Sequence, residues 1–296
     1  MLADVGRMMV DFIGAGGELT LHRLGADILA RHAPRSSKPR PVITLPGFMA
    51  SDDSMGRLTD FLVRQGFRAQ SWGLGRNQGL QGATWKDNLD KIRRHMTGEV
   101  RKLADQCSAP VALVGHSLGG VYARELAWHL ESEVDRVITL GSPTIHPYRR
   151  DRHNQAIQAF ASWFNRQSAT EFGGREGLLH WDPDRPKLPC IAIHSPLDGF
   201  VHESACHIPG YIVAQSTSRA PRENVRVLAT HTGMMFSVWV LLALADRLLA
   251  DRRRWKPFDP QAYFPSWASA LARVPYPAAG ELARDAGSAA FVRLNQ

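Results

Sequence analysis

The feature that most constrains the fold of this chain is a serine motif between an apolar segment and a helix-like segment. Residues 111–114 are apolar, the sequence Gly115-His116-Ser117-Leu118-Gly119 follows and matches G-x-S-x-G, and a helix-like pattern begins at once. A serine at such a junction sits in a strained turn, where side chains at the flanking glycines would collide with the adjoining strand and helix. The order therefore predicts a nucleophile elbow, a turn that presents a reactive serine at the end of a buried strand.

Strand and helix patterns alternate along the rest of the chain. Strands are predicted at 41–45, 67–72, 111–114, 134–140, 190–194 and 224–228, and helices at 52–65, 85–106, 118–130 and 234–250. Before them, residues 1–33 resemble an amphipathic helix with a break at Gly14–Gly17, followed by a basic, proline-rich linker. This alternation predicts an α/β fold with a mostly parallel sheet of about six strands flanked by helices.

One long segment does not fit the alternation. No strand is predicted between 142 and 189, and residues 156–164 form an aromatic, helix-like stretch. An insertion here would lie above the strand ends, where ligands bind in such sheets, and we interpret it as a helical cap or lid. The expected organisation is an N-terminal helical segment and linker (1–40), a core (41–143 and 190–258), a cap (144–189) and a C-terminal extension (259–296) packed on the core or partly flexible.

Composition is that of a soluble globular protein, with 44% hydrophobic and 22% charged residues among 296. Charges at Asp4, Arg7 and Asp11 interrupt the first apolar residues, so no export signal is predicted. The later apolar run at 234–245 is shorter than the ~20 residues of a membrane span. A cytoplasmic location is expected.

The net charge of +8 is concentrated partly in arginine clusters at 149–152 and 252–254. No aromatic-interleaved patch or nucleic-acid motif accompanies them, so solvated loop and helix-end charge is the expected role and nucleic-acid binding is not expected. Weak association with an anionic membrane surface stays open. The three cysteines are too few for a disulfide scaffold, and either a Cys190–Cys206 bridge or buried thiols would fit.

A serine hydroxyl needs a base to become a good nucleophile, and the base needs an orienting carboxylate. Asp198 follows the strand at 190–194, and His231 follows the strand at 224–228. Both positions match the order of serine, acid and histidine on successive strand-end loops. We therefore predict catalytic roles for Ser117, Asp198 and His231. Asp182 and Asp184 are weaker candidates for the acid because they precede a strand.

The oxyanion of acyl transfer needs two backbone N–H donors already in place. Leu118 follows the nucleophile at a helix N-terminus, and the loop at 45–49 follows the first core strand. In that loop Gly47 allows close approach of the backbone. Phe48 is the predicted second donor, with Met49 as the alternative.

Candidate substrate contacts lie near these loops and in the insertion. We name Met49, His116 and Val201 beside the loops, although His116 should point away from the serine's side of the turn. The aromatic residues of the insertion could line an acyl pocket or pack the cap onto the core: Phe160, Trp163, Phe164 and Trp181.

No metal or organic cofactor is required by this chemistry. The residues His194, Asp198, His202 and His207 have helical spacing, but Pro196 and Gly199 would break a helix there. The glycines at 73–79 do not fit a dinucleotide fingerprint and indicate a turn-rich loop near the mouth of the site. The match of 22–27 to an acyltransferase H-x₄-D pattern has no supporting motif.

Together the elbow, the Pro46-Gly47-Phe48 loop, Asp198 and His231 resemble the α/β-hydrolase superfamily, in particular its bacterial esterase- and lipase-like members. The resemblance covers about residues 41–258 and includes the stretches 72–77, 198–201, 223–225 and 255–258. Related lipases often have His-Gly where this chain has Pro46-Gly47. Some also have a cysteine where this chain has Thr232. Because this chain lacks that cysteine, a disulfide bridge to Cys206 is less expected.

The resemblance implies a serine hydrolase that cleaves small-molecule or lipid carboxylic esters through an acyl-enzyme. An acyltransferase and a non-catalytic lipid-binding protein are the alternatives. Acyl-chain preference and oligomeric state do not follow from the sequence.

Overall fold

The computed structural model describes residues 2–79, 85–144, 187–208 and 220–263. Its centre is a six-stranded sheet in the order β2-β1-β3-β4-β5-β6, with every neighbouring pair parallel. The strands are β1 (Pro41–Leu45), β2 (Arg68–Ser71), β3 (Val111–His116), β4 (Val134–Leu140), β5 (Cys190–His194) and β6 (Arg222–Arg226). The predicted parallel sheet of about six strands is confirmed.

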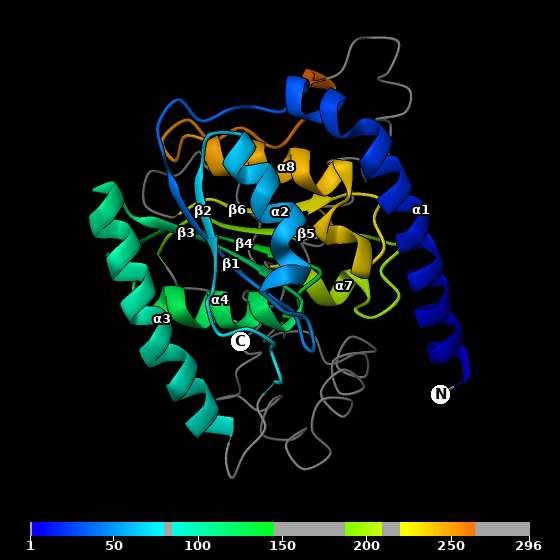
Figure 1. Cartoon of the computed structure of the whole chain (residues 1–296), viewed down its shortest axis with the longest axis horizontal. Coiled ribbons are helices and arrows are strands. Elements are labelled where there is room, and N and C mark those ends of the chain that lie inside the picture. Colours follow the sequence, from blue (N-terminus) through cyan, green and yellow to red (C-terminus); the bar gives the residue numbers. More distant parts are fainter. Residues whose placement is uncertain (1, 80–84, 145–186, 209–219, 264–296) are drawn as a thin grey trace, which may run out of the picture.

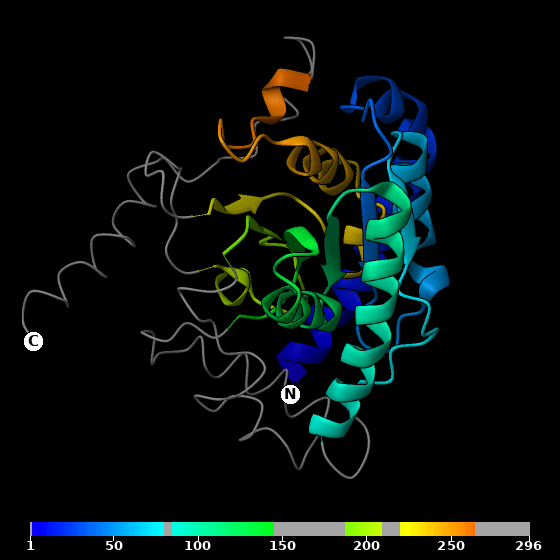
Figure 2. The same ribbon diagram turned by 90° about the vertical axis from the view of Figure 1, so that its left-hand side faces the viewer.

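Helices cover both faces of the sheet (Figure 1). On one face lie α3 (Trp85–Cys107) and α4 (Leu118–His129), packed on inward side chains of β1, β3 and β4. On the other lie α2 (Asp52–Arg64), α8 (Val238–Leu249) and the end of α1 (Leu2–His32). Figure 2 shows these layers from the side. Since both faces are covered, β1, β3 and β5 are buried along their whole lengths, as their apolar sequences require.

The first core helix shows how local sequence sets its limits. The Ser54 hydroxyl accepts a hydrogen bond of 3.1 Å from the backbone N–H of Ser51, which is the N-cap of α2. The N-cap is therefore the residue directly before the predicted start of the helix at 52. After the helix, Gly66 has φ of 84°, the left-handed conformation expected of a glycine that stops a helix.

Two predicted boundaries near the end of the core are wrong. The last strand begins and ends two residues earlier than the expected 224–228, because Arg222 and Glu223 are buried and belong to the strand. The expected continuous helix at 234–250 is divided into the 3₁₀ turn η1 (Thr232–Met235) and α8. Backbone N–H groups of Phe236 and Ser237 both donate to the Gly233 carbonyl, which closes the turn and separates it from α8.

The predicted glycine break in the N-terminal helix is also wrong, because α1 is continuous. Gly14 is instead a point of close packing: a Cβ there would lie 2.6 Å from Cγ2 of Thr230. The helix does not place its apolar residues inward over this stretch either. Asp11 is 1% exposed, whereas Phe12 and Ile13 are 60% and 74% exposed.

A buried carboxylate ties the end of the core to the last strand. Glu223 on β6 accepts hydrogen bonds from the Arg247 guanidinium, the Trp255 indole and the Phe258 backbone N–H, at 2.6–2.9 Å. Two of the stretches singled out in the sequence, 223–225 and 255–258, therefore meet at one carboxylate. After them comes η2 (Pro260–Tyr263).

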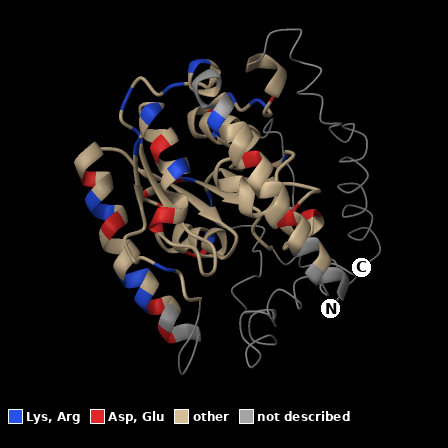
Figure 3. Cartoon of the chain, turned by 45° about the vertical axis from the view of Figure 1, so that its right-hand side comes forward, with Lys and Arg blue, Asp and Glu red and all other residues tan. Residues whose placement is uncertain are grey.

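The cysteines form no disulfide bridge. All three are free, and those at 190 and 206 are buried thiols. Basic and acidic residues are interspersed along α3 rather than separated (Figure 3). Among the described helices, none is long and apolar enough to cross a bilayer. The predicted cap, except for its ends, and most of the C-terminal extension lie outside the described residues.

Candidate active site

The predicted catalytic residues follow three different strands of the parallel sheet. Ser117 comes directly after β3, Asp198 follows β5, and His231 follows β6. In a parallel sheet the carboxyl ends of all strands lie at one edge, so the loops that bear these residues meet there. The three residues are between 3% and 6% exposed.

Ser117 occupies a strained turn, as the motif predicts. Its φ of 52° and ψ of −122° lie in a region that costs a non-glycine residue about 1–3 kcal/mol. The surroundings hold this conformation: the Ser117 N–H donates to the Leu140 carbonyl at 2.8 Å. Small neighbours are required as well, because a Cβ at Gly115 would overlap the backbone of Gly119, and one at Gly119 would overlap the Leu45 carbonyl.

The imidazole of His231 and the carboxylate of Asp198 form a buried pair. His231 Nδ1 lies 2.8 Å from Asp198 Oδ2, and the second carboxylate oxygen accepts backbone N–H groups of Phe200 and Val201 at 2.9 and 2.7 Å. A carboxylate can only accept, so Nδ1 carries the proton in the neutral ring. This tautomer leaves Nε2 with a free lone pair, which is the form that a general base needs.

Electrostatics at the pair favour a basic imidazole. Burial opposes the imidazolium form of His231, but the negative charge of Asp198, its hydrogen bond and the charge of Asp11 outweigh that cost and raise the pKa of His231 above its ordinary value. Two aromatic rings flank the imidazole, Phe200 at a centroid distance of 5.0 Å and His116 at 4.7 Å. Among the hydrogen bonds of the described chain, none joins Ser117 Oγ to His231 Nε2.

Gly141, which the sequence does not mark as functional, lies at the centre of this arrangement. It follows β4, has φ of 55°, and donates its N–H to the Ile193 carbonyl at 2.9 Å. A Cβ at this position would lie 2.8 Å from Asp198 Oδ2 and 3.0 Å from His231 Nδ1. The strand β4 bears neither the acid nor the base, but the glycine that follows it packs directly against both side chains.

The loop after β1 lies against the elbow. A Cβ at Gly47 would lie 3.0 Å from Cβ of Ser117, so the glycine permits the close approach expected of an oxyanion loop. The N–H of Met49 donates to the Asn77 carbonyl at 2.7 Å, which removes Met49 as the alternative oxyanion donor. Phe48 stays the predicted donor. Leu118, the other predicted donor, is the first residue of α4, where the N–H has no acceptor within the helix.

Asn77 is a second supporting residue, and the sequence, although it singles out the stretch 72–77, assigns it no role. Its buried amide donates to the Pro46 carbonyl at 2.8 Å, and its backbone N–H donates to the Ala50 carbonyl at 2.8 Å. With the bond from Met49, three hydrogen bonds tie it to the loop after β1. The stretch 73–79, predicted as a turn-rich loop near the site, therefore supports the loop after β1.

The structure assigns other roles to two predicted substrate contacts. His116 is 4% exposed, and its Nε2 lies 2.9 Å from the His231 carbonyl, to which it donates. Burial lowers the pKa of His116 to about 3, so the ring is neutral. The side chain of Val201 packs in the core. These two predictions are wrong, because both side chains turn inward to hold the neighbouring loops.

Other predicted substrate contacts are differently placed. Met49 is 49% exposed with φ of 59°, and its side chain is accessible in the loop after β1. The predicted aromatic contacts of the insertion lie outside the described residues: Phe160, Trp163, Phe164 and Trp181. So do the alternative acids Asp182 and Asp184.

Acidic residues of α1 also reach the site, although the sequence gives no sign of it. Asp11 accepts the backbone N–H groups of His231 and Gly199. Seven positions later, Glu18 accepts the backbone N–H of Thr230 at 2.7 Å.

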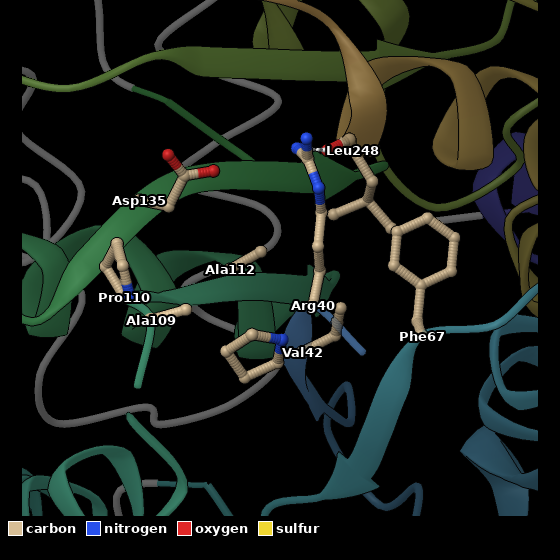
Figure 4. A pocket seen from close by; sticks show the side chains of 9 residues that line it. Arg40, Val42, Phe67, Ala109, Pro110, Ala112, Asp135 and Leu248 are labelled. Atoms are coloured by element: carbon tan, nitrogen blue, oxygen red, sulfur yellow. Dashed lines mark hydrogen bonds between the residues drawn. The ribbon is translucent and has the colours of Figure 1, made fainter. Parts of the chain in front are cut away.

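A hollow of about 220 Å³ lies at the opposite edge of the sheet (Figure 4). It is lined by residues at the amino ends of the strands and by one residue of α8: Arg40, Pro41, Val42, Phe67, Ala109, Pro110, Ala112, Asp135 and Leu248. This hollow is separated from Ser117 by the length of β3, so it takes no part in the chemistry of the site.

Comparison with protein families finds one relation. The profile of the PGAP1-like alpha/beta domain family matches residues 80–201, a range that contains Ser117 and Asp198 and ends before His231. Comparison with curated protein sequences finds no significant match.

Several solved structures are similar in backbone. A soluble variant of monoglyceride lipase from Saccharomyces cerevisiae, in complex with a substrate analog, has 15% identity and a TM-score of 0.46, covering 73% of this chain and 88% of that one. Est1E from Butyrivibrio proteoclasticus, with ferulic acid bound, has 14% identity and a TM-score of 0.43, covering 67% and 83%. The type II thioesterase BorB of the borrelidin biosynthetic cluster has 17% identity and a TM-score of 0.42, covering 73% and 93%. Likeness at this level carries no argument about the reaction.

Proposed function

We propose that this chain, whose residues 80–201 match the PGAP1-like alpha/beta domain family, is a serine hydrolase that cleaves carboxylic esters through an acyl-enzyme. The observation that carries the proposal is the buried His231–Asp198 pair, 2.8 Å apart, at the same sheet edge as the strained turn of Ser117. The pair supplies an oriented base, and the turn supplies a hydroxyl held at the end of a buried strand.

In the proposed first half-reaction, Ser117 Oγ attacks the ester carbonyl carbon while His231 Nε2 takes the hydroxyl proton. Oγ must turn toward Nε2 for this step, a contact that commonly tightens only when substrate binds. The carbonyl oxygen becomes an oxyanion, and the N–H groups of Phe48 and Leu118 stabilise it. Collapse of the tetrahedral intermediate breaks the bond to the alkoxy oxygen, which leaves as the alcohol with the proton from Nε2.

The second half-reaction reverses these roles. A water molecule gives its proton to His231 Nε2 and attacks the acyl carbon, and collapse returns the proton to Ser117 Oγ and releases the acid. Asp198 keeps the proton on Nδ1 and stabilises the imidazolium of each half-reaction without being protonated itself. Each step balances without a metal or organic cofactor.

We propose small-molecule or lipid esters as substrates. Phe48 and Met49 beside the elbow supply apolar surface, and Met49 is half exposed there. Hydrolysis rates over p-nitrophenyl esters from acetate to palmitate test this part. A maximum at two to six acyl carbons would indicate an esterase, and a preference for longer chains a lipase.

Replacement of the serine tests the function itself. Ser117→Ala should lower kcat on a p-nitrophenyl ester by at least about 10⁴-fold, since loss of a nucleophile removes most of the triad's contribution. The exposed Ser132→Ala is the matched control and should keep wild-type turnover. A fluorophosphonate probe should label the wild-type protein at Ser117 and leave the variant unlabelled. Turnover retained by a folded Ser117→Ala protein would contradict the proposal.

A further inference from the structure

Asp11 of α1 joins the two loops that bear the proposed acid and base. Its Oδ2 accepts the backbone N–H of His231 at 2.6 Å and that of Gly199, next to Asp198, at 3.0 Å. Its Oδ1 accepts the N–H of Thr232 at 3.0 Å. The residue is 1% exposed, so one buried carboxylate receives three backbone donors from two loops.

Glu18 makes a parallel contact two helical turns further along. Its Oε1 accepts the Thr230 N–H at 2.7 Å, and its Oε2 lies 3.2 Å from the Thr230 hydroxyl. Residues seven apart lie on one face of an α-helix, which explains why both acids reach the same segment. In Figure 1, α1 runs beside the yellow segment that precedes α8.

Two glycines allow this contact between helix and loop. A Cβ at Gly14, on the same face of α1, would lie 2.6 Å from a methyl carbon of Thr230, and a Cβ at Gly233 would overlap the Glu18 carboxylate. Phe12 adds an edge-to-face contact with Phe200, at a centroid distance of 5.7 Å, and Phe200 in turn stacks on His231. Helix, acid loop and base loop are therefore packed as one unit.

We propose that α1 is a positioning element of the active site, in which Asp11, assisted by Glu18, fixes the loop of Asp198 relative to the loop of His231. The inference rests on the proposed function, because it assigns these residues a part in the same reaction. Asp11 touches neither Ser117 nor the reacting atoms, so it acts through the backbone of its neighbours. Small misplacement of a base can cost about 10²-fold in rate, which is the scale of effect expected.

The charge of Asp11 gives the proposal a signature that packing alone would not. The groups that face His231 are Asp198 after β5, Asp11 on α1 and the neutral His116 of β3, with Glu18 one residue away through Thr230. Asp11 contributes to the raised pKa of His231. Removing its charge should therefore lower that pKa and move the acidic limb of kcat/KM to lower pH.

Asp11→Asn is the test variant, because it keeps the size of the side chain. The asparagine loses the charge and turns a donor toward one of the three N–H groups. On a p-nitrophenyl ester we expect kcat to fall about 10- to 100-fold with KM changed by less than about threefold. Arg23→Gln, an exposed charge change on the same helix, is the matched control and should leave kcat and the pH profile unchanged.

Two measurements do not depend on turnover. NMR titration of the His231 imidazole should show a lower pKa in Asp11→Asn than in the wild type. Hydrogen exchange of the wild-type protein should show the amides of Gly199, Thr230, His231 and Thr232 protected like those of α1. The exchange measurement needs no variant, so it decides the question even if Asp11→Asn does not fold.

The outcomes separate this inference from the proposed function. If the wild type cleaves esters but Asp11→Asn keeps its kcat and its acidic limb, the positioning role is wrong and the hydrolase assignment stands. If the wild type neither cleaves esters nor reacts with a fluorophosphonate, the hydrolase assignment fails. In that case a changed His231 titration would still support the link between α1 and the loop, and an unchanged one would overturn it.

Discussion

Gly141 lies so close to His231 that a Cβ on the glycine would be 3.0 Å from the imidazole Nδ1. The same atom would be 2.8 Å from Asp198 Oδ2. The end of β4 thus bears no reactive group, yet it determines how near the acid and base can approach the sheet. Its φ of 55° adds a second reason for glycine.

Gly141→Ala should damage both stability and activity. Overpacking and the left-handed backbone together should cost about 1–3 kcal/mol of unfolding free energy, and displacement of the imidazole should lower kcat about 10- to 100-fold. Gly75→Ala is the matched control, because Gly75 has φ of 69° and open space where its Cβ would be. Urea denaturation and ester hydrolysis of the two variants measure the difference. Equal kcat in both would show that Gly141 does not limit the position of the pair.

Asn77→Ala should loosen the loop after β1, which bears the predicted oxyanion donor Phe48. The variant leaves the Pro46 carbonyl without its buried donor, at a cost of about 1–3 kcal/mol in stability. If Phe48 supplies an oxyanion N–H, its displacement should also lower kcat, toward the roughly 10²–10³-fold effect of losing one donor. The neighbouring exposed Gln78→Ala is the control. A large loss of stability with kcat unchanged would separate Asn77 from catalysis and speak against Phe48 as donor.

Glu18→Gln should change how stability depends on pH. Burial raises the pKa of Glu18 from 4.5 to about 7 despite its bonds to Thr230. Between pH 4.5 and 7 the Glu18 carboxyl is ionised in the unfolded chain but still protonated in the folded protein. The free energy of unfolding of the wild type therefore falls as pH rises through that interval. The glutamine variant has no such loss, and its Tm relative to wild type should rise with pH and level off above 7.

Glu133→Gln offers a control of opposite sign. Hydrogen bonds from Ser132 and Arg101 lower the pKa of Glu133, so its contribution to stability is present above the ordinary pKa and lost as pH falls. The Tm of Glu133→Gln relative to wild type should therefore fall as pH rises. Thermal melts of the three proteins from pH 3 to 8 make the comparison, since the Glu133 effect falls below pH 4.5 and the Glu18 effect between 4.5 and 7. Parallel curves for the two variants would contradict the assignment at Glu18.

Much of the fold follows from short stretches of sequence. The central strands β1, β3 and β5 are largely apolar runs, the elbow is a local pattern of glycines around Ser117, and the order of Asp198 and His231 follows from one loop per strand. Each of these signals lies within a few residues of the feature that it predicts. For the same reason the sequence alone predicts the α/β class and places the candidate site at the carboxyl ends of the parallel strands.

The supporting residues could not be predicted in this way. Asp11, Asn77 and Gly141 contact backbone or side chains that are distant in the sequence, 220 residues away for the bond between Asp11 and His231. An isolated acid on a helix normally indicates a solvated face, so the sequence does not mark Asp11 as a buried residue of α1. The inward direction of His116, by contrast, does follow from the sequence, because successive strand residues point to opposite sides.

The bond between Asp11 and the His231 backbone has a consequence for how the protein is made. During synthesis α1 leaves the ribosome long before the segment that it holds, and a separation of 220 residues must close before the site exists. Loop-closure entropy grows slowly with length, about 0.6 kcal/mol per doubling, so the final stability is little affected. Contacts so distant along the chain slow folding, however. We expect ester hydrolysis to be acquired last during refolding, after the sheet has formed.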